Sequence, residues 1–202
     1  EWEEEVLVAN TEGVFAEEKR VRTRLFVLAV AQDGAEVQTG YSAPGKSVGL
    51  ELFDLYPPKA VGEKAARQAL TNLKARPAPA GTFPVVVGPG FGGVLFHEAV
   101  GHLLETTSVA RKASVLADKL GEVVASPAVT YIDDGTLPHA WGSTEMDDEG
   151  RPTERTVLIE KGVLKSYMVD RLGHLLTGYP MTGSGRRQDY TFAPTSRMRN
   201  TF

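Results

Sequence analysis

Two histidines and a glutamate lie close together in an apolar part of the sequence, at His97, Glu98 and His102. Neutral imidazole is the commonest protein ligand for zinc. A carboxylate beside one such ligand can take a proton from a metal-bound water whose pKa has fallen to about 7. These three residues therefore predict a metal site with hydrolytic chemistry, in which His97 and His102 bind the metal and Glu98 is the catalytic base.

The spacing of the two histidines differs from the H-E-x-x-H pattern, in which ligands at i and i+4 share one face of a helix. His97 and His102 are five residues apart, and five steps of roughly 100° place them about 140° apart around an ideal α-helix. A one-residue π-bulge would return both to one face, and Gly101 would lower the steric cost of that distortion. We therefore expect one helix whose hydrogen bonds are irregular between Ala99 and Leu103.

The residues before the motif indicate how it is positioned. Residues 85–87 are a β-branched run that predicts a strand, and residues 88–93 are a glycine-rich turn leading into the histidine helix. A phosphate-binding role for these glycines lacks the Lys-Ser/Thr pair of a P-loop. The alternative for the histidines is that they are hydrogen-bonded residues of a protein core.

Residues 88–102 resemble the signature of the TldD/PmbA family, the so-called modulators of DNA gyrase, and specifically of its TldD branch. Residues 21–24 and residues 183–190, 193–194 and 197–201 resemble the same family. The resemblance implies a cytoplasmic zinc metallopeptidase that works with a PmbA/TldE-like partner subunit lacking the histidine motif. It also implies that the two histidines bind zinc together with a cysteine from a later, β-rich part of the protein, and that the glutamate is the base.

The sequence departs from this family pattern because it contains no cysteine. We therefore interpret the chain as a central fragment, and we expect the third zinc ligand to lie outside it. Two imidazoles alone leave zinc short of the three protein ligands usual in catalytic sites, so the chain by itself is expected to hold no fully coordinated metal.

Other residues of the chain carry groups that can bind a metal. His174 lies on a short apolar run that predicts a packed helix, and His139 follows a proline in a loop. Asp133 and Asp134 precede a glycine and indicate a turn in which aspartates bond to their own backbone. Glu105, eight residues after His97, is a candidate partner that orients one imidazole, with a solvated carboxylate at the helix end as the alternative.

Composition limits the classes of function. The chain has 202 residues, of which 42% are hydrophobic and 24% charged, and its net charge is −4. No apolar run reaches the length of a membrane span, and an acidic balance gives no support to direct nucleic-acid binding. Arginines 186, 187, 197 and 199 form a local basic cluster, which we interpret as a solvated loop, with a contact to a peptide carboxylate or to a further domain as the alternative.

The periodicity predicts an α+β fold, with an antiparallel sheet and a covering helix followed by the metal-motif helix and a β-rich portion. In the first half we expect strands at residues 5–9, 20–32 and 36–41, with a hairpin turn at Asp33-Gly34. Pro57-Pro58 predicts the start of a helix that covers the sheet. The apolar stripe of this helix is formed by Val61, Ala65, Ala69, Leu70 and Leu73.

The second half is expected to begin after a linker at residues 77–81. We predict residues 1–76 as part of an N-terminal α+β domain, and residues 82–202 as the metal-motif helix and the start of a C-terminal β-rich domain. Within it, the pattern predicts a strand at 83–88, a histidine helix at 93–105 and a second helix near 110–120. Short strands follow at 122–125, 129–132, 156–160 and 163–169, and the tail from Thr182 is expected to be a loop.

Two hypotheses follow for function. The first is a metallopeptidase that hydrolyses unfolded or extended peptides, bound by pairing with a strand edge. The second is a non-catalytic interaction protein whose metal motif is structural or vestigial. The sequence does not identify the peptide, nor whether zinc, iron or manganese is the native metal.

Overall fold

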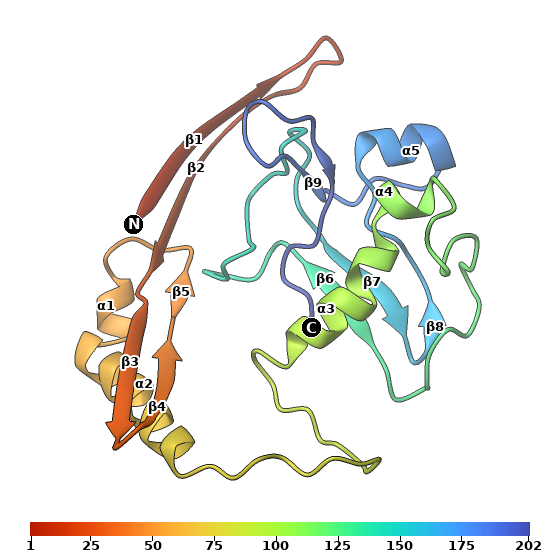
Figure 1. Ribbon diagram of the computed structural model, residues 1–202. Helices are drawn as coiled ribbons and strands as arrows, with labels where there is room; N and C mark the ends of the chain where they lie inside the picture. The colour runs from red at the N-terminus through yellow and green to blue at the C-terminus, as the bar shows by residue number, and fades with distance from the viewer. The chain divides into compact units, whose positions relative to one another are not determined.

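The computed structural model describes residues 1–202 and has a mixed α+β fold, as predicted (Figure 1). The chain divides into two compact units. The first comprises residues 1–4 and 21–86, and the second comprises residues 5–20 and 87–202. Strands β1 (Trp2–Ala9) and β2 (Phe15–Arg24) each contribute residues to both units.

The first unit contains the end of β2, which pairs with β5 (Gly45–Lys46), and a separate hairpin of β3 (Val27–Asp33) and β4 (Glu36–Ser42). The predicted hairpin is confirmed, although Asp33 still pairs with Glu36 and the two turn residues are Gly34, with a φ of 58°, and Ala35. The single long strand predicted over residues 20–32 is wrong, because β2 pairs with β5 while β3 pairs with β4. The chain therefore changes partner at residues 25–26.

Helix α2 (Pro58–Leu73) follows the short helix α1 (Leu52–Leu55) and packs against the β3–β4 hairpin. Its buried residues Val61, Ala65 and Ala69 confirm most of the predicted stripe, although Leu70 is exposed. The close approach depends on Gly40 of β4, because a Cβ atom there would overlap the backbone of α2 at Ala65 and Ala69. The covering helix is therefore seated directly on the hairpin.

No strand forms at residues 83–88, contrary to the prediction. The segment is not paired with any other strand, and the side chain of Val86 is almost fully exposed. A β-branched run needs a partner strand to satisfy its backbone groups in a sheet. The sequence pattern alone did not reveal that this partner is absent here.

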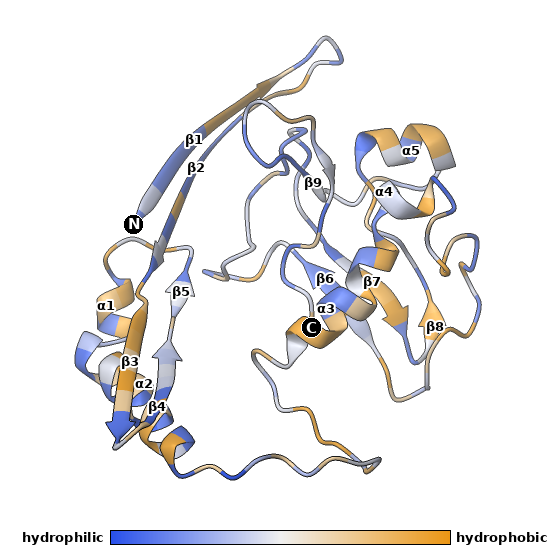
Figure 2. Cartoon of the chain, viewed as in Figure 1, coloured by the Kyte–Doolittle hydropathy of each residue, from blue (hydrophilic) through white to orange (hydrophobic).

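The second unit is built on an antiparallel sheet of β6 (Tyr131–Asp134), β7 (Arg155–Glu160) and β8 (Val163–Leu164). The hairpin between β7 and β8 turns at Lys161-Gly162, both with positive φ, as predicted. Figure 2 shows hydrophobic residues along β7 and β8. The core around them comprises Leu104, Val109, Tyr131, Leu158, Ile159, Leu164, Tyr167, Met168, Val169 and Met198.

Two further strand predictions are wrong in extent. Residues 122–125 form only one isolated bridge, between Val123 and Val163. The strand predicted over 163–169 ends at Leu164, because Met168 pairs instead with the histidine region. The Met168 N–H donates to the Leu104 carbonyl at 2.9 Å, and the Thr106 N–H donates to the Met168 carbonyl at 3.0 Å.

The helix predicted near residues 110–120 is also wrong, and a short helix α4 (Thr106–Val109) is present instead. Side chains take the backbone groups that a helix would pair. The Tyr167 hydroxyl donates to the Leu116 carbonyl at 2.6 Å, and the Lys119 N–H donates to the Tyr167 hydroxyl at 3.2 Å. Lys112 and Asp118 both have positive φ, which interrupts a right-handed helix.

The C-terminal residues are part of the second unit, contrary to the prediction of a loop. They form β9 (Gly185–Arg186) and β10 (Thr195–Ser196), which pair with each other after helix α5 (Arg171–Thr177). Beyond β10, Ile132 and Phe202 exchange two backbone hydrogen bonds of 2.9 and 3.0 Å. The chain end therefore extends the sheet beside β6.

None of the helices combines the length and the apolar character that crossing a membrane requires.

Candidate metal centre

The glycine-rich turn before the histidines is tightly wound. Gly90 has a φ of 89°, and a Cβ atom on Gly92 would overlap the carbonyl oxygen of Gly88. The turn ends in hydrogen bonds from the Gly93 N–H to the Gly90 carbonyl at 2.9 Å and from the Val94 N–H to the Phe91 carbonyl at 3.1 Å. These bonds start helix α3 (Gly93–Ala99), which carries His97 and Glu98.

The helix breaks between the two histidines. Helix α3 ends at Ala99, Val100 has φ −129° and ψ −45°, and a 3₁₀ helix, η1 (Gly101–Leu104), carries His102. The predicted irregularity between Ala99 and Leu103 is therefore confirmed. The predicted form is wrong, because two short helices meet at Val100 where one helix with a π-bulge was expected.

This break brings the imidazoles together despite their spacing of five residues. The ring centroids of His97 and His102 lie 4.7 Å apart, with an angle of 89° between the ring planes. The Glu98 carboxylate approaches the same place, with Oε2 3.8 Å from Nε2 of His102. One ligand atom from each of the three residues lies within 4.8 Å of the others.

The donor set of this cluster fits a transition metal such as zinc. Imidazole nitrogens and a carboxylate oxygen are zinc ligands, and they converge here from two adjoining helices. The side chains remain open to solvent, with 38% of His102 and 67% of Glu98 exposed. A metal and a water molecule could therefore both reach the group.

Glu105 contacts the second histidine from the buried side. Its Oε2 lies 3.1 Å from Nδ1 of His102, and 3.3 Å from Nη1 of Arg197. The Glu105 side chain is only 4% exposed. The expected contact with an imidazole is thus present, and the alternative of a solvated carboxylate is wrong.

Gly101 serves a purpose different from the one predicted. Its φ is not positive, so the backbone there is one that other residues adopt. A Cβ atom at this position would instead overlap the sulfur of Met198. Gly101 therefore leaves room for the Met198 side chain to pack against the backbone of η1.

The other candidate ligands do not join the cluster. The Nδ1 atom of His174 lies 2.7 Å from the Tyr179 carbonyl oxygen, as expected of a hydrogen-bonded histidine on α5. His139 lies in a loop with a φ of 57°. Asp134 bonds to its own turn through the Thr136 N–H at 2.8 Å, which confirms the local pattern, although both Asp133 and Asp134 lie on strand β6.

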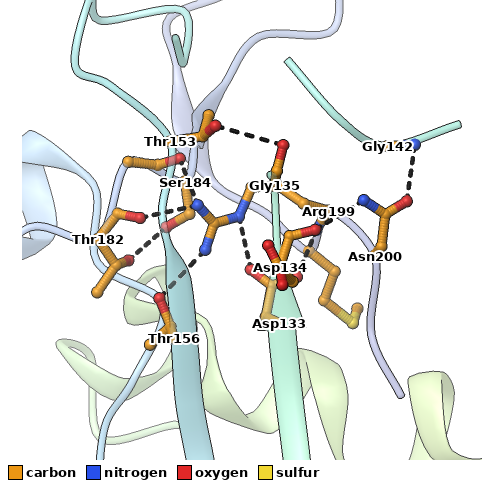
Figure 3. Close-up of polar contacts among 12 residues, drawn as sticks. Asp133, Asp134, Gly135, Gly142, Thr153, Thr156, Thr182, Ser184, Arg199 and Asn200 are labelled. Atoms are coloured by element: carbon orange, nitrogen blue, oxygen red, sulfur yellow. Dashed lines mark hydrogen bonds and ion pairs between the residues drawn. The ribbon is translucent and has the colours of Figure 1, made fainter. Parts of the chain in front are cut away.

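Asp133 belongs to a buried polar network that sequence reasoning missed (Figure 3). Its Oδ2 accepts a hydrogen bond from Nε of Arg199 at 2.8 Å, and the two side chains are 0% and 6% exposed. The guanidinium also donates to the carbonyls of Thr182 and Gly183 and to the Thr156 hydroxyl. The interpretation of Arg199 as part of a solvated loop is therefore wrong, whereas Arg197 is half-exposed and lies in a loop as predicted.

A separate carboxylate, Glu149, lies in a partly buried position. Its Oε2 accepts a hydrogen bond from the Arg171 N–H at 2.8 Å. The pKa of Glu149 is raised to about 7, chiefly by burial and in part by the nearby carboxylates of Asp147 and Asp170, against the opposing effect of that hydrogen bond.

Comparison with protein families matches both parts of the chain. Residues 1–73 match the PmbA/TldA metallopeptidase central domain, and residues 80–202 match the PmbA/TldA metallopeptidase C-terminal domain.

Individual relatives agree with the family match. A metalloprotease TldD homolog from Haemophilus influenzae is 42% identical over 207 residues, which cover 98% of this chain and 42% of the relative. A zinc metalloprotease TldD homolog from Saccharolobus solfataricus is 30% identical over 179 residues, covering 88% of this chain and 40% of the relative. The fold is similar to that of TldE from Thermococcus kodakarensis, with a TM-score of 0.80, 22% identity, and coverage of 95% of this chain and 42% of that one. The chain thus spans about two fifths of the length of the proteins it matches.

Proposed function

Because the chain belongs to the PmbA/TldA metallopeptidase family, we propose that it carries the metal-binding and proton-transferring residues of a zinc metallopeptidase. The observation that carries this proposal is the approach of His97, Glu98 and His102 to within 4.8 Å of one another across a helix break. Two of the three ligands usual in a catalytic zinc site would come from this chain.

In this proposal His97 and His102 hold zinc through their imidazole nitrogens. Because Nδ1 of His102 faces Glu105, the nitrogen left for the metal is Nε2, the one nearer to Glu98. When bound, zinc supplies a Lewis acid that polarises the scissile carbonyl and lowers the pKa of water. The third protein ligand lies outside residues 1–202, as the absence of cysteine here and the family resemblance together suggest.

Glu98 acts as the general base and then as the general acid. Its carboxylate is mostly exposed, so it can meet the attacking water at the open side of the cluster. It removes a proton from that water and delivers the proton to the leaving amine. The Glu98 side chain extends from α3 next to His97, which keeps the base beside the metal ligands throughout.

The proposed substrate is an unfolded or extended peptide. Recognition through the peptide backbone by pairing with a strand edge would give little sequence preference, and it would select chains that are not folded.

We further propose a PmbA/TldE-like partner subunit for the parent protein. The similarity in fold between this chain and TldE is in keeping with an assembly of two related subunits. The proposed division is residues 1–76 as one α+β part, 77–81 as a linker and 82–202 as the part bearing the metal motif. The acidic net charge of −4 supports no direct role for nucleic acid.

The test uses the parent protein assembled with its partner. Glu98→Gln should retain zinc but lower peptide hydrolysis by about 10²–10⁴-fold, which is the usual contribution of a general base. His97→Ala and His102→Ala should lose both zinc and activity. Glu63→Gln on the exposed surface of α2 is the matched control and should change neither.

The second candidate, a non-catalytic interaction protein, predicts a different result. Glu98→Gln would then leave hydrolysis, partner binding and phenotype unchanged. Metal analysis of the assembled protein should find zinc, with iron or manganese as the outcomes that would change the assignment of the metal.

A further inference from the structure

Three consecutive residues near the C-terminus contact the part of the chain that carries His102. The Ser196 hydroxyl accepts a hydrogen bond from the Thr107 N–H at 3.0 Å and lies 3.0 Å from the Thr107 hydroxyl. Arg197 contacts Glu105 through Nη1. The Met198 sulfur lies against Gly101. We call residues 196–198 the brace, because they hold η1 and the start of α4 from one side.

Glu105 lies between the brace and His102. A single oxygen, Oε2, faces both Nδ1 of His102 at 3.1 Å and Nη1 of Arg197 at 3.3 Å. The other oxygen, Oε1, is buried and has no hydrogen-bond partner. Leaving a buried acceptor without a partner is unfavourable, and an apolar side chain of similar volume would avoid it. Packing alone therefore does not account for a carboxylate at this position.

The contact with His102 does account for it. An imidazole whose Nδ1–H donates to a carboxylate is held in one tautomer, with the lone pair on Nε2. Arg197 contacts the same carboxylate oxygen and supplies a positive charge next to it. The Met198 sulfur lies against the backbone of η1 at Gly101, in the helix that carries the ring.

We propose that Glu105 and Arg197 are positioning residues that hold His102 in the tautomer and orientation needed to bind a metal through Nε2. The inference rests on the proposed function, in which His102 is a metal ligand. Neither residue touches the metal or the peptide in this proposal, since both act through His102.

The first experiment examines the metal-free parent protein by nitrogen-15 NMR of the histidine side chains at pH 8. His102 should be present as the tautomer protonated on Nδ1. In Glu105→Met, which preserves volume but has no acceptor oxygen, this single tautomer should be lost. Glu105→Gln should restore it, because the amide oxygen can still accept the Nδ1–H. A role in packing alone would leave the tautomer unchanged in Glu105→Met.

The second experiment titrates the parent protein, assembled with its partner, with zinc against a competing chelator. Glu105→Met should weaken zinc binding by about 10–100-fold, as is typical when a partner of a metal-binding histidine is lost. Arg197→Met should weaken it in the same direction by a smaller factor, and Arg197→Lys should recover part of the loss.

A closely matched control is available in the same unit. The Arg155 side chain is 51% exposed and pairs with Asp134, whose side chain is 4% exposed. The Arg197 side chain is 50% exposed and pairs with Glu105, whose side chain is also 4% exposed. Arg155→Met should bind zinc with the affinity of the unmodified chain. Because Arg197 and Arg155 are both half-exposed, their variants should fold even if Glu105→Met does not.

The outcomes separate this inference from the proposed function. If His97→Ala and His102→Ala abolish zinc binding while the Glu105 and Arg197 variants bind normally, the positioning role is refuted and the metal site stands. If the unmodified chain shows His102 protonated on Nε2, the positioning role is refuted as well. If His97→Ala binds zinc as before, the metal site itself is refuted.

Discussion

Replacing Arg199 by methionine should destabilise the second unit severely. The substitution preserves most of the side-chain volume but removes the only cationic group in contact with Asp133, which is fully buried. It also removes the guanidinium donors to two backbone carbonyls and to the Thr156 hydroxyl. One hydrogen bond to Asp133 survives, because the backbone N–H of residue 199 donates to Oδ1 at 2.7 Å.

The size of the effect follows from these contacts. Removing one partner of a buried ion pair typically costs about 3–5 kcal/mol, because a charge is left buried without compensation. That is a large fraction of the roughly 5–15 kcal/mol by which a domain is stable. Arg199→Lys retains the charge but not the planar fork of donors, so it should cost less, on the order of 1–2 kcal/mol.

The assay is urea unfolding followed by the fluorescence of Trp141, in a Trp2→Phe background so that only the second unit reports. The double variant Asp133→Asn/Arg199→Met removes both charges and retains an acceptor for the backbone N–H of residue 199. It should lose less stability than the sum of the two single variants, by about 0.5–3 kcal/mol. A loss below about 1 kcal/mol for Arg199→Met, or strict additivity in the double variant, would refute the reasoning.

Two further predictions concern burial and close packing. The pKa of Glu149 is raised from 4.5 to about 7, chiefly by burial, so the folded chain binds this proton more tightly than the unfolded chain. The free energy of unfolding should therefore fall as the pH rises from about 4.5 to about 7. The partial exposure of the group limits the fall to on the order of 1 kcal/mol, and Glu149→Gln should remove it, as urea titrations across that pH range would detect. Gly40→Ala should lower the stability of the first unit by about 1–3 kcal/mol or more, because the added Cβ overlaps the backbone of α2. Gly62→Ala has open space around its Cβ position and should stabilise α2 by up to about 1 kcal/mol. Thermal melts in which Gly40→Ala has the higher melting temperature of the two would contradict the packing.

The sequence predicted those features that depend on local chemistry. The hairpin turn after Asp33, the start of α2 at the proline pair and the turn at Lys161-Gly162 all follow from residues adjacent in the chain. The break between His97 and His102 was also predictable, because an undistorted helix cannot bring residues five apart together. Its form was not, since η1 packs at Gly101 against Met198, a residue far along the chain.

Features that depend on distant partners could not be predicted in this way. Arg199 and Asp133 are 66 residues apart, and nothing in their local sequence indicates that they pair. The helix expected near residues 110–120 fails because the Tyr167 hydroxyl, about 50 residues later, binds the backbone there. The strand expected at residues 83–88 has the right residue types but no neighbouring strand.

The contact between Arg197 and Glu105 has a consequence for the order in which the chain can fold. The two residues are separated by 92 positions, and closing a flexible loop of that length costs about 4 kcal/mol of chain entropy by the logarithmic scaling of loop closure. During synthesis from the N-terminus, His97 and His102 leave the ribosome long before residues 196–198 exist. Under the proposed positioning role, the second histidine therefore stays without its restraint until residues 196–198 have been made. Ordering of His102 is thus a late event in the folding of residues 87–202, and it belongs to the stage at which β10 pairs with β9 and Phe202 pairs with Ile132.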